Sequence, residues 1–136
     1  TCCDLNQIQA KLDACEGSEL KIYNANSATL LESLKIGCAG FSGVMANFHP
    51  ELYAELISIY KNDPAKAQKI QDFVGFFSVA ECQCYPVNAK YYLSLEGLDI
   101  NMDSRARNKA EFPPNRQLEI QQMFELTKLY KENILK

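Results

Sequence analysis

The chain has 136 residues, of which 47% are hydrophobic and 23% are charged. This composition is typical of one soluble globular unit and excludes a mainly disordered chain. The formal net charge of −3, with basic residues scattered among acidic ones, gives no basic patch for a nucleic acid. No apolar run approaches the roughly 18 residues that span a bilayer, and the N-terminus lacks the pattern of a signal peptide. We therefore expect a cytoplasmic protein with no nucleic-acid partner and no membrane partner.

The six cysteines are interpreted as reduced thiols rather than as a disulfide framework, because a chain of this size can build a core without cross-links. The cysteine spacing, together with the single His49, does not supply the converging ligands that a structural zinc site needs. We expect no metal and no cofactor. Cys82 and Cys84, which form a C-x-C pair, are predicted to be buried thiols.

The N-terminal third of the chain predicts an alternation of helices and strands. A capping-box pattern and apolar residues at helical spacing predict a first helix from about Asp4 to Cys15. Residues 19–23 alternate in the way of a short strand. A second helix follows and ends near Gly37, which suits the position after a helix C-terminus. The uncharged segment 38–45, rich in small residues, predicts a fully buried second strand.

The rest of the chain predicts helices. Apolar stripes indicate one helix after Pro50, another that Asp63 caps with Pro64 in its first position, and a third from about Pro86. Residues 97–116 have no sustained period and are predicted to form a long connection before a last helix. Two parallel strands joined by a helix do not form a stable sheet alone. We therefore expect further strands upstream.

Several of these segments resemble a known enzyme family. The run Asn24-Ala25-Asn26-Ser27, followed by residues 34–47 and then by Pro50, is similar to the seventh and eighth βα units of the dihydrodipicolinate synthase/N-acetylneuraminate lyase family. Residues 85–90 and 95–98 resemble the C-terminal helical extension of that family. The resemblance is strongest over residues 23–50 and weak beyond residue 101.

The resemblance implies an α/β fold that is the C-terminal part of a (β/α)₈ TIM barrel. Residues 1–50 would then be the last βα units, and residues 51–136 the final barrel helix and a C-terminal helical extension of one larger domain. It also implies a lysine-dependent aldolase or lyase, in which a Schiff base between a lysine and pyruvate or a related 2-oxo acid serves as the electron sink. The family's lysine aligns two residues before Thr1, so we expect no catalytic residue in this chain.

The implied partners are a small-molecule 2-oxo acid, the N-terminal remainder of the barrel, and further copies of the chain, since family members are often tetramers. In a barrel the functional face lies at the C-terminal ends of the strands. The resemblance accordingly predicts six substrate-binding residues, namely Ala25, Asn26, Ser27, Ser42, Gly43 and Val44. Ala25 matches a position that is usually glycine in the family, and its methyl group would reduce the space beside the substrate. Ser27 and Ala28 stand where sialic-acid lyases carry acidic residues, which argues against that substrate.

Several alternatives stay open. Within the family, the chain could belong to a dihydrodipicolinate synthase proper or to a 4-hydroxy-2-oxo acid aldolase. An alternative of another class is a non-catalytic helical interaction module. Asn26 and Ser27 could serve only as helix caps, and the small residues Gly40, Ser42 and Gly43 only for packing. Asn47 is interpreted as tying down a turn, and the lone His49 as a surface or capping residue.

Overall fold

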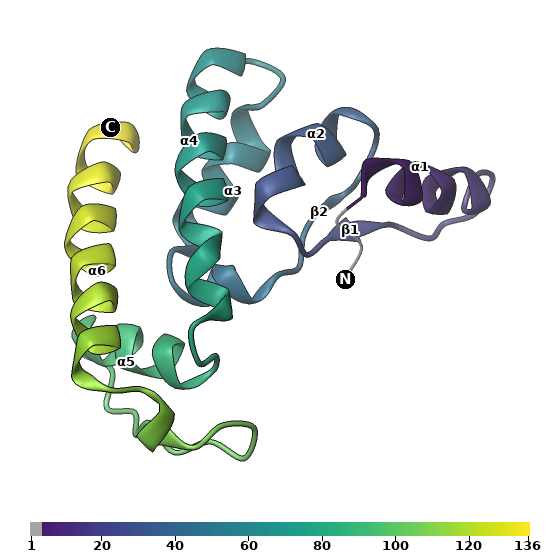
Figure 1. The fold of residues 1–136 in the computed structure, drawn as a ribbon. Helices are drawn as coiled ribbons and strands as arrows, with labels where there is room; N and C mark the ends of the chain where they lie inside the picture. The colour runs from purple at the N-terminus through teal and green to yellow at the C-terminus, as the bar shows by residue number, and fades with distance from the viewer. Residues whose placement is uncertain (1–3) are drawn as a thin grey trace. The chain divides into compact units, whose positions relative to one another are not determined.

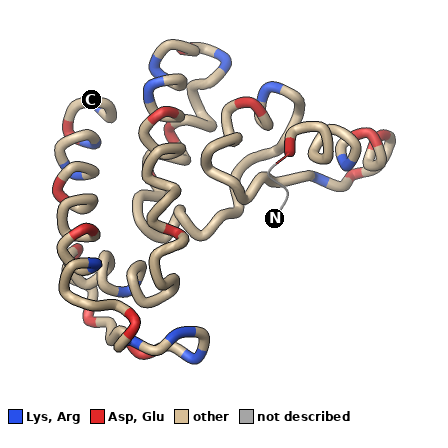
Figure 2. Tube along the Cα trace, viewed as in Figure 1, with Lys and Arg blue, Asp and Glu red and all other residues tan. Residues whose placement is uncertain are grey.

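A computed structural model of the chain describes residues 4–136. The described residues divide into two compact units, the first made of residues 4–46 and 50–78, and the second of residues 47–49 and 79–136. No helix in the part of the chain that the structure describes is long and apolar enough to cross a membrane. Figure 2 shows acidic and basic residues interspersed along the trace.

The first unit begins with helix α1, which spans Leu5–Ala14 (Figure 1). A carboxylate oxygen of Asp4 accepts the Asn6 backbone N–H at 2.9 Å and so satisfies one of the free donors at the helix N-terminus. The predicted first helix and its cap are confirmed. Ile8 is the residue of α1 that the unit buries.

Two short parallel strands and the helix between them follow. Strand β1 spans Tyr23–Asn24 and strand β2 spans Gly40–Phe41, and Tyr23 pairs with Gly40. A 3-10 helix, η1 (Ser27–Thr29), leads into helix α2 (Leu30–Lys35). Gly37, with φ +115°, ends the turn after α2 as predicted. The predicted parallel βαβ unit is confirmed (Figure 1).

The lengths of the two strands were predicted wrongly. Leu20, in the first predicted strand, is 72% exposed and lies outside β1. The second predicted strand reached residue 45, but β2 ends at Phe41 and the chain then forms 3-10 helix η2 (Val44–Asn47). Ser42, which lies between them, is exposed rather than buried. Strand length depends on which backbone groups find pairing partners, and residue type alone does not reveal this.

Helices α3 (Pro50–Ile59) and α4 (Pro64–Phe77) complete the first unit and lie side by side in Figure 1. Asp63 caps α4 by accepting the Lys66 backbone N–H at 2.9 Å, and Pro64 takes the first helical position. Both features were predicted. The core of the unit is formed by apolar side chains of α2, α3 and α4, namely Leu30, Leu31, Leu34, Leu52, Tyr53, Leu56, Ala67, Ile70 and Val74.

The second unit contains 3-10 helix η3 (Ser78–Cys82, from its second residue onward) and helix α5 (Val87–Leu95). It continues with 3-10 helix η4 (Lys109–Glu111) and helix α6 (Pro114–Ile134). Tyr92 of α5 makes edge-to-face contacts with Phe48 at 5.2 Å and with Phe124 of α6 at 5.4 Å between ring centroids. The predicted long connection is confirmed between α5 and α6, except that it includes η4.

Three side chains of this unit lie elsewhere than predicted. His49 is fully buried, so its interpretation as a surface residue was wrong. The reason is that residues 47–49 pack with the distant segment 79–136, which local sequence does not indicate. Cys82, at the end of η3, is exposed and Cys84 is half-buried, so the prediction that both thiols are buried was wrong. The Asn47 side chain donates to the Tyr85 hydroxyl at 3.2 Å.

Candidate functional site

The two groups of predicted site residues meet at one edge of the small sheet. Residues 25–27 follow β1, and residues 42–44 follow β2. Because the strands are parallel, their carboxyl ends lie at the same edge. The backbone N–H of Ser42 donates to the Asn24 carbonyl at 2.8 Å and joins the two segments directly.

Gly43 lies against the backbone of the first segment. A Cβ atom placed on Gly43 would be 2.4 Å from the Ala25 carbonyl oxygen and 2.3 Å from the Phe41 ring. These separations are well below ordinary van der Waals contact, so no larger residue fits without displacing its neighbours. The structure therefore brings Ala25 and Gly43 together through the absence of a side chain at residue 43.

Asn24 shapes the loop that follows β1. Its side chain is buried, and its amide nitrogen donates to the Thr29 hydroxyl at 3.0 Å and to the Ser33 hydroxyl at 2.9 Å. Its amide oxygen accepts the Asn26 backbone N–H at 2.8 Å. Such a turn, closed by an Asn side chain two residues back, is a local signal in the sequence. Asn24 is nevertheless not among the six predicted site residues, although it belongs to the run that carries the resemblance.

The side chains of Asn26 and Ser27 form hydrogen bonds to other residues of the chain. The Asn26 side chain accepts the Thr29 backbone N–H at 3.2 Å and caps η1, as the capping alternative predicted. The Ser27 hydroxyl is buried and lies 2.7 Å from the Tyr53 hydroxyl of α3. The Tyr53 ring in turn stacks on Phe41, with centroids 4.2 Å apart and planes 3° from parallel. The loop, β2 and α3 are thus held as one structure.

Replacing Tyr53 with phenylalanine should destabilise the protein by about 1 to 2 kcal/mol, because the buried Ser27 hydroxyl loses its partner while the ring stack persists. Denaturant unfolding measures the change. The matched control is Tyr60→Phe, at a half-buried residue just after α3, which should change stability by no more than about 0.5 kcal/mol. Equal losses in the two variants would contradict a stabilising Ser27–Tyr53 bond.

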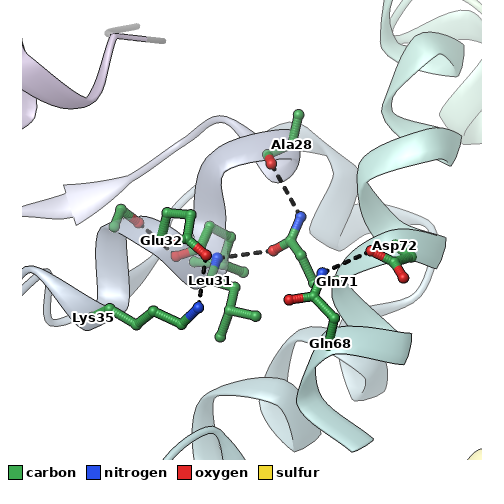
Figure 3. Close-up of polar contacts among 9 residues, drawn as sticks. Ala28, Leu31, Glu32, Lys35, Gln68, Gln71 and Asp72 are labelled. Carbon is green, nitrogen blue, oxygen red and sulfur yellow. Dashed lines mark hydrogen bonds and ion pairs between the residues drawn. The ribbon is translucent and has the colours of Figure 1, made fainter. Parts of the chain in front are cut away.

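Gln71 of α4 holds the loop from the other side (Figure 3). Its buried amide oxygen accepts the Leu31 backbone N–H at 2.8 Å, and its amide nitrogen donates to the carbonyls of Ser27 at 2.9 Å and Ala28 at 3.1 Å. Leu31 lies in the first turn of α2, where backbone N–H groups lack partners within the helix. One side chain therefore fixes both the loop and the start of α2. Its role depends on packing between distant segments, so the local sequence carries no signal for it.

The site is electrically neutral. None of its six predicted residues carries an ionisable side chain, so these residues can position and exclude but cannot act as a general acid or base. Nearby, burial raises the pKa of the Cys38 thiol, and a hydrogen bond with Ser33 opposes this effect. Within residues 4–136, no group of three or more His, Cys, Asp or Glu side chains is arranged to hold a metal ion.

Comparison with known proteins supplies the family. No curated protein and no solved structure matches the chain. A family model described as the Dihydrodipicolinate synthetase family matches residues 1–108, a range that includes both strands and the six predicted site residues. This family consists of lyases and synthases, and the resemblance seen in the sequence is confirmed. The chain belongs to the dihydrodipicolinate synthetase family.

Proposed function

We propose that this chain forms part of the substrate-binding wall of a lysine-dependent aldolase or lyase that acts on pyruvate or a related 2-oxo acid. The observation that carries the proposal is the close contact between Ala25 and Gly43 at the carboxyl ends of two parallel strands. This contact lies within the segment that the family model matches. In (β/α)₈ barrels, active sites are built at this end of the strands.

The neutral site suits a positioning role. Schiff-base chemistry needs a lysine amine, and the resulting imine accepts the electron pair when the carbon–carbon bond breaks or forms. We propose that this lysine belongs to a segment that precedes residue 1, as the resemblance to the family implies. The exposed Ser42 and the half-buried Ala25 and Gly43 would then contact the bound 2-oxo acid, together with Asn26 and Val44.

The shape of the loop favours a small substrate. Ala25 stands where the family usually has glycine, and its added methyl group reduces the space beside the substrate. Ser27 and Ala28 replace the acidic residues that hold the hydroxyl chain of a sialic acid in the lyases specific for it. Because the Ser27 hydroxyl bonds to Tyr53, it is not free to replace those carboxylates. We therefore propose pyruvate or a short 2-oxo acid, as in dihydrodipicolinate synthases or 4-hydroxy-2-oxo acid aldolases.

Borohydride reduction tests the proposed chemistry. The intact protein, including any segment that precedes residue 1, is incubated with pyruvate, reduced, digested and analysed by mass spectrometry. We expect one reduced pyruvyl adduct, on a lysine upstream of Thr1, because reduction converts the imine to a stable amine. The control omits pyruvate. Absence of an adduct from every lysine would contradict the Schiff-base proposal and favour a non-catalytic helical module. An adduct on a lysine within residues 1–136 would contradict the proposed position.

A further inference from the structure

Two cysteines of the second unit line a shared depression. Its volume is about 260 Å³, and its lining consists of Cys82, Gln83, Cys84, Arg107, Glu111 and Arg116. Both cysteines are free thiols, Cys82 being exposed and Cys84 half-buried. None of these residues belongs to the candidate substrate site. The depression thus combines two accessible thiols with two guanidinium groups.

The backbone turns between Cys82, at the end of η3, and the start of α5. Cys82 ends η3, where the Gln83 N–H donates to the Ala80 carbonyl at 3.0 Å. Cys84 has φ +64°, in the left-handed region, and its carbonyl accepts the Val87 N–H at 2.9 Å at the start of α5. Cα atoms two residues apart in a bent chain lie within roughly 7 Å, close to the span that a disulfide bridges. The Cα separation is therefore compatible with a disulfide between Cys82 and Cys84.

Arg107 and Arg116 have N–H groups that remain exposed and could donate to an anion. Arg107 lies 3.6 Å from Glu111, and Arg116 lies 2.7 Å from Glu119, but the two arginine side chains are still 57% and 44% exposed. Each guanidinium has five N–H donors, and one carboxylate engages at most some of them. Figure 2 shows basic residues on the loop that follows α5. The lining carries two guanidinium groups against one carboxylate, that of Glu111, so a ligand that carries carboxylates would be attracted to the thiols.

We propose that Cys82 and Cys84 form a thiol–disulfide exchange site for an acidic low-molecular-weight disulfide. The Cys82 thiolate attacks one sulfur of that disulfide, which forms a mixed disulfide and releases the first thiolate. The Cys84 thiolate then attacks the Cys82 sulfur, which forms the Cys82–Cys84 disulfide and releases the second thiolate. The protein loses two electrons, which the external disulfide gains, and the two thiol protons pass to the leaving thiolates.

The order of the two steps follows from exposure and charge. Cys82 is exposed and can reach a disulfide from solvent. Burial raises the pKa of the Cys84 thiol, Glu111 raises it further, and Arg107 opposes them. Because Cys84 is also the less exposed of the two thiols, we assign it the second step, in which the neighbouring mixed disulfide is already in place.

Peptide mapping after incubation with glutathione disulfide tests the exchange. Trypsin cleavage after Lys69 and Lys90 releases peptide 70–90, whose only cysteines are Cys82 and Cys84. In the unaltered protein this peptide should lose two hydrogens and retain no glutathione. Cys84→Ser should accumulate glutathione on Cys82, and Cys82→Ser should leave Cys84 unmodified on the same time scale. Two free thiols in this peptide, under conditions that modify the half-buried Cys15, would overturn the proposal.

A second comparison tests the arginines. The variant Arg107→Gln/Arg116→Gln should slow the reaction with glutathione disulfide by roughly threefold, as expected for exposed charge pairs, and leave the reaction with neutral bis(2-hydroxyethyl) disulfide unchanged. Arg105→Gln is the matched control, because Arg105 lies on the same loop but outside this depression. Equal slowing with both reagents, or the same effect from Arg105→Gln, would overturn the anion-binding part of the proposal.

Discussion

Replacing Gln71 with leucine is expected to lower the free energy of unfolding by about 3 kcal/mol. The substitution leaves the Leu31 N–H and the carbonyls of Ser27 and Ala28 without the amide that now bonds to them. Each buried backbone group that loses its partner costs about 1 to 3 kcal/mol, and the new apolar contacts of leucine offset part of that loss. At neutral pH Gln71→Glu should be at least as destabilising, because an ionised carboxylate would be buried facing the carbonyl oxygens of Ser27 and Ala28.

Gln68 provides the matched control for this prediction. It lies on the same helix and is drawn beside Gln71 in Figure 3, but its amide bonds to the exposed Asp72 at 2.8 Å. Gln68→Leu should change the free energy of unfolding by no more than about 0.5 kcal/mol. Denaturant unfolding of both variants, followed by circular dichroism, measures the difference. If the two substitutions cost the same, Gln71 does not hold the loop in the way its contacts indicate.

The elements that were predicted correctly are those whose sequence signals lie within a few residues of the element itself. The side chains of Asp4 and Asp63 cap helices by accepting backbone N–H groups two and three residues further along the chain. Gly37 adopts a positive φ just after α2. The bonds of Gln71 to Ser27 and of Tyr53 to Ser27 join residues 44 and 26 positions apart. No local pattern predicts such contacts, because they form only when α3 and α4 pack against the loop after β1.

The two predicted segments come together in the fold, but the contacts that their side chains make were not predicted. The resemblance identified two short segments, and the structure joins them through the Ser42–Asn24 backbone bond and the Gly43–Ala25 contact. What the sequence did not reveal is how these side chains are used. The Ser27 hydroxyl faces Tyr53, and the buried Asn24 side chain organises the turn. Residue type and order cannot distinguish a hydroxyl that supports a loop from one that faces a ligand.

The second large effect is expected for Gly43→Ala, which should lower the free energy of unfolding by about 3 kcal/mol. The added methyl group would lie 2.4 Å from the Ala25 carbonyl oxygen, a backbone atom fixed by the loop, and 2.3 Å from the Phe41 ring. Phe41 cannot turn aside freely, because it stacks on the buried Tyr53. The substitution must therefore separate the two segments of the candidate site.

Gly40→Ala is the matched control in the neighbouring strand. Its added methyl group would lie 3.2 Å from the Tyr23 ring, whose side chain is 53% exposed and can rotate away. Lower entropy of the unfolded chain offsets the remaining crowding, so the net change should be under about 1 kcal/mol. Denaturant unfolding measures both variants, and borohydride trapping of pyruvate in the intact protein should lose yield only for Gly43→Ala. Equal stability losses would show that the Gly43–Ala25 contact is not a tight constraint. A destabilised Gly43→Ala protein that still traps pyruvate fully would separate the contact's structural role from the proposed function.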